Sequence, residues 1–212
     1  MTDNIIITIG REYGSGGHKI GNRLSERLDI PLYDHNLIRM AARELNVTDE
    51  AAMQVDETIL GRFLSAYVVG TGDYTAFMTE DVYGVPLSDR MYSAQSKIIK
   101  KLADLGPCIF VGRCADYVLG DYSNVINTFI HAYKDDRINR IMDIYKLNER
   151  QAWDKIKKVD KERKLYYEAH TGRAWGTSDS HEILINASLT GIDGAVEILE
   201  ALYYKKKQLA EK

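Results

Sequence analysis

The sequence predicts an α/β fold with three layers, in which helices flank a parallel sheet on both faces. Short apolar runs alternate along the 212 residues with segments of helical periodicity. The apolar runs contain few polar residues, as expected for strands that are buried on both faces. A hydrophobic content of 45% is ordinary for a globular protein.

The apolar runs predict strands at residues 4–9, 108–112, 124–130 and 181–188, with a short extended piece before Asp34. Apolar side chains that recur every three or four residues predict helices at 18–29, 88–105, 134–146 and from Asn148 to about residue 168. Asp34, Thr48 and Thr190 are expected to cap further helices, the second over 48–66 and the third near the C-terminus. Asn148 and Gln151 have the spacing of a capping box, and residues 67–87 predict an irregular insert.

Composition and charge argue against several kinds of partner. The net charge of −3 favours neither nucleic acid nor an anionic membrane surface. No apolar run has the length of a membrane span, and the N-terminus lacks the features of a signal peptide. We therefore expect a cytoplasmic protein that binds neither nucleic acid nor membranes. Cys108 and Cys114 have the spacing of neither a redox pair nor a zinc pair.

Glycines follow the first predicted strand, in the segment GREYGSGGHK, and a helical pattern starts directly after them. Gly14, Gly16 and Gly17 permit positive φ angles and a close approach of the backbone to a ligand. The start of the helix directs free N–H groups at the same place, which suits a phosphate. The alternative is a plain turn from strand to helix.

This segment departs from the usual phosphate loop, G-x-x-x-x-G-K-[ST]. With Gly16 as the last glycine, Gly17 occupies the lysine position and His18 the Ser/Thr position. The positive charge then has to come from Arg11, Lys19 or an arginine elsewhere in the chain. Ser15 is the candidate for a hydroxyl ligand to Mg²⁺.

Arg113 directly follows the second long strand, at the edge of the sheet where ligands bind in parallel α/β folds. A guanidinium group there suits bidentate contact with a phosphate. Asp116 is expected to orient Arg113 or to accept a hydrogen bond from a base. The alternative is an Arg–Asp pair that only holds the end of the strand.

Basic residues gather on the two helices after the third strand. Arg137 and Arg140 share one face of the first helix, and the second contains KKVDKERKLYY with Asp160 and Arg163. The two helices are predicted to form a lid that brings positive charge over transferring phosphates, since phosphoryl transfer depends on positioning and electrostatics. The alternative is a solvated, charged helical hairpin.

The segments ITIGREYGSGGHKIG, PLYDHNLI, QSKIIKKLADLGPCIFVGRCADYVL, KKVDKERKLYY and INAS resemble the cytidylate-kinase-like family of P-loop nucleoside monophosphate kinases. The resemblance spans nearly the whole chain and implies a fold like that of the P-loop NTP hydrolases, in one domain. Its core would comprise residues 1–44, 91–145 and 177–212, with a monophosphate-binding insert at about 45–90 and a lid at about 146–176. The implied reaction transfers the γ-phosphate of ATP, with Mg²⁺, to a nucleoside monophosphate, CMP or dCMP in first place.

The candidate site residues form three groups. The catalytic candidates are Arg11, Lys19, Arg137 and Arg163, and the candidates for the phosphates of ATP are Gly14, Ser15, Gly16, Gly17, His18, Lys19 and Arg140. The acceptor candidates are Asp34, Arg39, Arg113, Asp116 and Asp160; among them Asp34, Arg113 and the pair Asp160/Arg163 match positions of the family. A kinase for another small acceptor and a nucleotide-binding regulator without turnover are the alternatives. The sequence does not address the oligomeric state.

Overall fold

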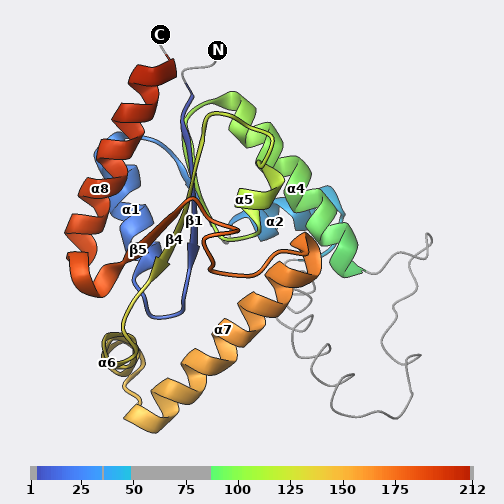
Figure 1. The fold of residues 1–212 in the computed structure, drawn as a ribbon. Coiled ribbons are helices and arrows are strands. Elements are labelled where there is room, and N and C mark those ends of the chain that lie inside the picture. Colours follow the sequence, from blue (N-terminus) through green and yellow to red (C-terminus); the bar gives the residue numbers. More distant parts are fainter. Residues whose placement is uncertain (1–3, 35, 49–86, 211–212) are drawn as a thin grey trace. The chain divides into compact units, whose positions relative to one another are not determined.

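The computed structural model describes residues 4–34, 36–48 and 87–210 (Figure 1). The chain divides into two compact units, Met1–Asp34 with Leu102–Lys212, and His35–Lys101. The second unit contains α2 (Asn36–Glu44) and most of α4 (Leu87–Leu105). The predicted helix at 48–66 lies outside the described residues except at Thr48, and the predicted insert at 67–87 lies outside them except at Leu87, the first residue of α4.

A five-stranded parallel sheet forms the centre of the first unit, which confirms the predicted α/β class. The order is β2-β3-β1-β4-β5. Its strands are β1 (Ile6–Arg11), β2 (Leu32–Tyr33), β3 (Cys108–Val111), β4 (Val125–His131) and β5 (Ile183–Asn186). β1 ends two residues later than predicted, because its pairing with β4 continues to Arg11 opposite Ile130. Arg11 therefore belongs to the central strand and not to the loop after it.

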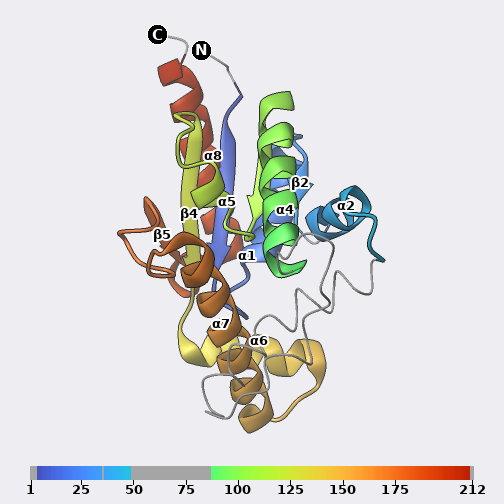
Figure 2. The same cartoon turned by 90° about the vertical axis from the view of Figure 1, so that its right-hand side faces the viewer.

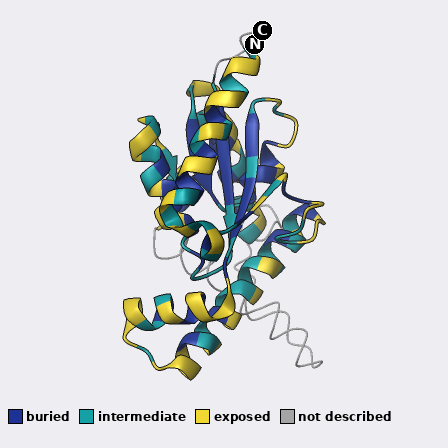
Figure 3. Ribbon diagram, turned by 60° about the vertical axis from the view of Figure 1, so that its left-hand side comes forward, coloured by how far each residue is buried: buried dark blue, intermediate teal, exposed yellow. Residues whose placement is uncertain are grey.

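Two helices cover one face of the sheet, α1 (Gly17–Leu28) and α8 (Ala187–Ala210), as Figure 1 shows. Alternate residues of β1, such as Ile7 and Ile9, are fully buried against Leu24 of α1 and Leu199 of α8. Figure 3 shows the strands as the most buried part of the unit. Ile6 and Thr8, which point to the other face, are buried as well, so β1 is covered on both faces and anchors the start of the loop that follows it.

The last helix begins earlier than predicted, and Thr190 is not its cap. The backbone is helical from Ala187 and is interrupted at Gly191, which has a φ of 68°. The hydroxyl of Thr190 donates to the carbonyl oxygens of Gly191 at 2.9 Å and of Asn186 at 3.4 Å. A cap accepts a hydrogen bond from a backbone amide, so the side chain has the opposite role.

A helical hairpin follows β4, formed by α6 (Lys134–Tyr145) and α7 (Glu149–Thr171). Figures 1 and 2 show α6 and the first part of α7 beyond the carboxyl ends of the strands. The two helices have a small core of their own, made by Ile138, Ile141, Ala152 and Ile156. The predicted capping box of Asn148 and Gln151 is present with both of its hydrogen bonds.

The short helix α5 (Ala115–Val118) was not predicted, since one turn shows no periodicity. It lies on the face of the sheet opposite α1 and α8 (Figure 1). Cys108 and Cys114 are both buried as free thiols. In the described ranges no helix is long and apolar enough to span a membrane.

Truncation of Leu24 tests the packing of α1 against the sheet. Leu24→Ala leaves a cavity in the main core, where Leu24 is fully buried, and is expected to lower the free energy of unfolding by about 2–5 kcal/mol. Leu209→Ala on α8 is the control, since this side chain is 60% exposed and its loss should change stability by at most about 0.5 kcal/mol. Urea unfolding measures both, and equal effects would contradict the packing described here.

Candidate functional site

The segment between β1 and α1 lies at the middle of the sheet edge where the parallel strands end. β1 is the central strand, and β3, β4 and β5 end at the same edge. Gly14 and Gly16 have φ angles of 81° and 94°, which favour glycine. No side chain caps the N-terminus of α1. The first amides of this helix therefore lack an intrahelical partner and form an electropositive site suited to an anion.

Ser15 closes the loop onto itself. Its backbone N–H and its hydroxyl both donate to the carbonyl oxygen of Glu12, at 3.3 and 2.9 Å. The side chain is fully buried. The hydroxyl that the sequence suggests as a ligand to Mg²⁺ is thus engaged within the loop, and it can reach a metal ion only by leaving Glu12.

The structure explains why the loop has no lysine at position 17. A Cβ atom on Gly17 would lie 2.6 Å from Cβ of Arg11, closer than two such atoms can approach. Lys19, two residues further along α1, is exposed to solvent. Arg11 therefore occupies the space beside the position at which the usual loop carries its lysine.

Arg11 extends from the end of β1 across the turn that follows β3. A Cβ atom on Gly112 would lie 1.9 Å from Nη1 of Arg11, so only glycine fits at position 112 beside this side chain. The pKa of Arg11 is lowered to about 9, mainly by burial and also by the charges of Arg163 and Arg113, while Asp34 raises it and offsets part of this effect. The guanidinium group is thus short of compensating negative charge.

Asp34 is the carboxylate nearest to Arg11. Its Oδ1 lies 3.4 Å from Nη2 of Arg11, and its Oδ2 lies 3.3 Å from Nε2 of His18 at the start of α1. Asp34 is buried, whereas the His18 side chain is 56% exposed. The structure therefore brings together three residues that sequence analysis assigned to different roles.

Arg113 lies in an unusual stretch of backbone directly after β3. Gly112, Arg113 and Cys114 have φ angles of 78°, 60° and 54°, so three consecutive residues are left-handed. For a residue other than glycine this conformation costs about 1–3 kcal/mol, and such strain is common at functional sites. The turn places Arg113 within electrostatic reach of Arg11 and Arg163.

Arg163 reaches the loop from α7. Its Nη1 donates to the carbonyl oxygen of Arg11 at 3.1 Å, and its guanidinium group lies 5.4 Å from the centre of the Tyr13 ring. Burial lowers the pKa of Arg163, while Asp160 and Asp34 raise it. Three partly buried arginines thus gather at the ends of β1 and β3, with Asp34 and Asp160 as the carboxylates that act on them, and this cluster of positive charge fits an anionic ligand.

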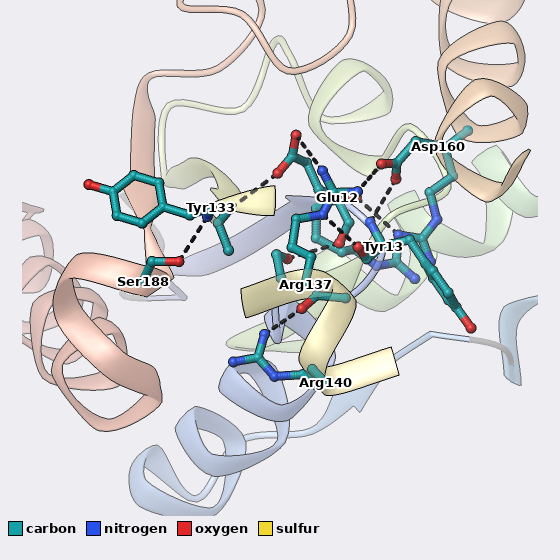
Figure 4. Close-up of polar contacts among 12 residues, drawn as sticks. Glu12, Tyr13, Tyr133, Arg137, Arg140, Asp160 and Ser188 are labelled. Carbon is teal, nitrogen blue, oxygen red and sulfur yellow. Dashed lines mark hydrogen bonds and ion pairs between the residues drawn. The ribbon is translucent and has the colours of Figure 1, made fainter. Parts of the chain in front are cut away.

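Arg137 and Arg140 of α6 contact the loop through its carbonyl oxygens (Figure 4). Nε of Arg137 donates to the carbonyl oxygen of Tyr13 at 2.8 Å, and Arg140 donates to that of Gly14. Arg137 also forms ion pairs with Glu12 and Asp160. The sequence analysis missed Glu12 and Tyr13. The available signal was Glu12, because an acidic residue inside a candidate anion-binding loop requires a basic partner.

Asp116 takes no part in these contacts. Asp116 is buried on α5 and accepts a hydrogen bond of 2.6 Å from the hydroxyl of Tyr167 on α7, and burial raises its pKa. Arg39 is exposed on α2, in the second unit. In the described part of the chain, no group of three or more His, Cys, Asp or Glu residues has the arrangement of a metal site.

Comparisons with solved structures found proteins similar to this chain over most of its length. An uncharacterized protein from Eubacterium ventriosum is 27% identical, with a TM-score of 0.66, over 94% of this chain and 98% of the other. Shikimate kinases from Bacteroides thetaiotaomicron (13% identity, TM-score 0.49, 93% and 97% coverage) and Aquifex aeolicus (18%, 0.42, 95% and 98%) are more distant. No curated protein sequence matches significantly.

The family assignment rests on the sequence model of the cytidylate kinase-like family. The structural matches with TM-scores below 0.5 do not support a family assignment. That model matches residues 6–189. The matched range includes β1 with its loop, the turn after β3 and both helices of the hairpin. The chain belongs to the cytidylate kinase-like family.

Proposed function

We propose that the protein transfers the γ-phosphate of ATP to a nucleoside monophosphate, with CMP and dCMP as the preferred acceptors. Membership of the cytidylate kinase-like family supports a P-loop phosphotransferase. The carrying observation is the uncapped N-terminus of α1 next to three partly buried arginines, Arg11, Arg113 and Arg163. The choice of a cytidine nucleotide follows from the family resemblance.

In this proposal the backbone amides of residues 14–18 hold the phosphates of ATP, and arginines replace the missing lysine. Arg11 and Arg163 supply the charge at the transferred phosphoryl group, with Lys19 as the further cationic candidate on α1. Arg140 assists from α6, since its guanidinium group lies close to Gly16. Phosphoryl transfer requires mainly positioning and charge stabilisation, so a guanidinium group can do the work of an ammonium group.

Mg²⁺ fits the site as a companion of the nucleotide. When bound, it neutralises charge on the β- and γ-phosphate oxygens. The described residues offer no carboxylate cage, so phosphate oxygens and water would provide most of its ligands. Ser15 is the proposed protein ligand, after its hydroxyl has left the carbonyl oxygen of Glu12.

The acceptor is proposed to bind beyond the carboxyl end of β3. Arg113 contacts its phosphate, and Asp34 and Asp116 contact its other polar groups. The predicted role of Arg39, which belongs to the second unit, stays a prediction. Two alternatives follow from the same site: a kinase for a different small acceptor, and a regulator that binds nucleotide without turnover.

A coupled assay of ADP release over all common nucleoside monophosphates tests the proposal. Activity with CMP and dCMP alone supports it. Turnover with a different acceptor overturns the choice of cytidine nucleotides but keeps the kinase. ATP binding in calorimetry without turnover for any acceptor indicates the regulator.

Arg113→Ala is expected to raise the KM for the acceptor by about tenfold to a hundredfold, because it removes a charge-assisted contact with the acceptor phosphate. The KM for ATP should change much less. Arg150→Ala on α7 is the control, since Arg150 is exposed in the first turn of this helix and is not among the proposed site residues. Steady-state kinetics of both variants measure these constants. An unchanged acceptor KM in Arg113→Ala would reject the contact between Arg113 and the acceptor phosphate.

Restoring the lysine should harm the protein and not improve it. Gly17→Lys places a Cβ atom against Arg11, which must move, so ATP binding is expected to weaken about tenfold or more. Asn22→Lys adds the same charge at an exposed position of α1 and serves as the control. Calorimetry measures both affinities. Tighter binding by Gly17→Lys would show that position 17 still accepts the lysine.

ATP binding should take up protons in alkaline solution. Because the pKa of Arg11 is lowered to about 9, part of this group is neutral near that pH, and a bound anion favours the charged form. Uptake is therefore expected to be larger at about pH 9 than at about pH 7. Calorimetry in buffers of different ionisation enthalpy measures it, and Arg11→Gln should abolish the difference. Equal uptake at both values contradicts a contact between Arg11 and the ligand.

A further inference from the structure

The backbone of Tyr13, in the middle of the phosphate loop, is held by two side chains of the helical hairpin (Figure 4). Its N–H donates to Oδ1 of Asp160 at 2.7 Å, and its carbonyl oxygen accepts from Nε of Arg137 at 2.8 Å. Asp160 comes from α7 and Arg137 from α6. Asp160 and Arg137 also pair with each other, so the two anchors form one unit.

Every nitrogen of the Arg137 guanidinium group is engaged. Nε contacts Tyr13, Nη1 lies 3.1 Å from Oε1 of Glu12, and Nη2 pairs with Oδ2 of Asp160. Only 7% of the side chain is exposed. Because this side chain is almost fully buried and already pairs with two carboxylates, a phosphate has little access to it. These contacts favour positioning over direct contact with the nucleotide.

Glu12 connects this unit to the sheet. Its Oε2 accepts from the backbone N–H of Ala132 at 3.1 Å, and its own N–H donates to the carbonyl oxygen of Ile130 at 3.0 Å. Both partners lie at the end of β4 or directly after it. A continuous chain of charged contacts therefore runs from the sheet through Glu12 and Arg137 to Asp160 and the Tyr13 N–H.

We propose that Asp160, acting with Arg137, is a positioning residue that holds the phosphate loop in its binding shape. The inference rests on the proposed binding of a triphosphate by this loop. Two glycines in left-handed conformations give the loop many alternative shapes, and a ligand that has to select one of them binds more weakly. By fixing Tyr13 on both sides, Asp160 and Arg137 remove that cost before the nucleotide arrives.

Asp160→Asn tests this role, because it keeps the shape of the side chain and removes the charge that faces Arg137. The amide of Tyr13 is expected to exchange with solvent about tenfold faster or more, measured by NMR in the protein without nucleotide. The KM for ATP should rise about tenfold or more, while the KM for the acceptor stays within about twofold. A purely structural role would change the KM values for ATP and acceptor together, or neither of them. A contact between Asp160 and the acceptor would raise the KM for the acceptor and leave the KM for ATP unchanged.

Two further variants complete the experiment. Asp154→Asn on the same helix is the matched control, since Asp154 pairs with Lys157 at 2.9 Å and its side chain is 58% exposed. It should leave Tyr13 exchange and both constants unchanged. Arg137→Lys keeps the charge but loses the fork that links Tyr13, Glu12 and Asp160, and it should reproduce the effect of Asp160→Asn. If Asp160→Asn does not fold, Arg137→Lys alone tests the positioning role.

The outcomes separate this inference from the proposed function. Unchanged Tyr13 exchange in Asp160→Asn and Arg137→Lys overturns the positioning role, whatever the enzyme does. Faster exchange in a protein whose wild type binds no ATP supports the anchoring of Tyr13 and rejects the triphosphate as its purpose. Faster exchange with a raised acceptor KM and an unchanged KM for ATP also overturns the inference.

Discussion

The turn between β1 and α1 needs the N–H groups at the start of α1 for a ligand, so these groups cannot also hold the shape of the turn. The structure meets this constraint with contacts to the other side of the backbone. The carbonyl oxygens of Arg11, Tyr13 and Gly14 accept hydrogen bonds from Arg163, Arg137 and Arg140. The hairpin of α6 and α7 therefore does more than cover the site, because it supplies the groups that shape the loop.

The packing around Arg11 explains which residues supply positive charge in place of a loop lysine. Gly17 packs against Arg11, which leaves no room for a lysine in the loop, and the charge comes instead from the end of β1, from the turn after β3 and from α7. Arginines from separate elements repel one another, while Asp34 and Asp160 offset part of that repulsion. An anionic ligand would add further compensating charge, which favours its binding.

Sequence patterns predicted the sheet, α1 and the capping box of α7, because each depends on residues close together in the chain. They also led to Arg113, which directly follows a predicted strand, and to Arg163, on the basic helix of the hairpin. Sequence patterns could not predict the hydrogen bond between Asp160 and Tyr13, because the two residues lie 147 positions apart and meet only through tertiary packing. Thr190 shows the other failure: Gly191 interrupts the helix, and the hydroxyl contacts carbonyl oxygens instead of capping amides.

A crystal structure of the protein with Mg²⁺ and a non-hydrolysable ATP analogue will decide whether arginines and backbone amides replace the loop lysine. We expect the β- and γ-phosphates against the amides of residues 14–18, with Arg11 or Arg163 at about 3 Å from a γ-phosphate oxygen. A triphosphate bound elsewhere at saturating analogue, or held in the loop by Lys19 without either arginine, would contradict this explanation.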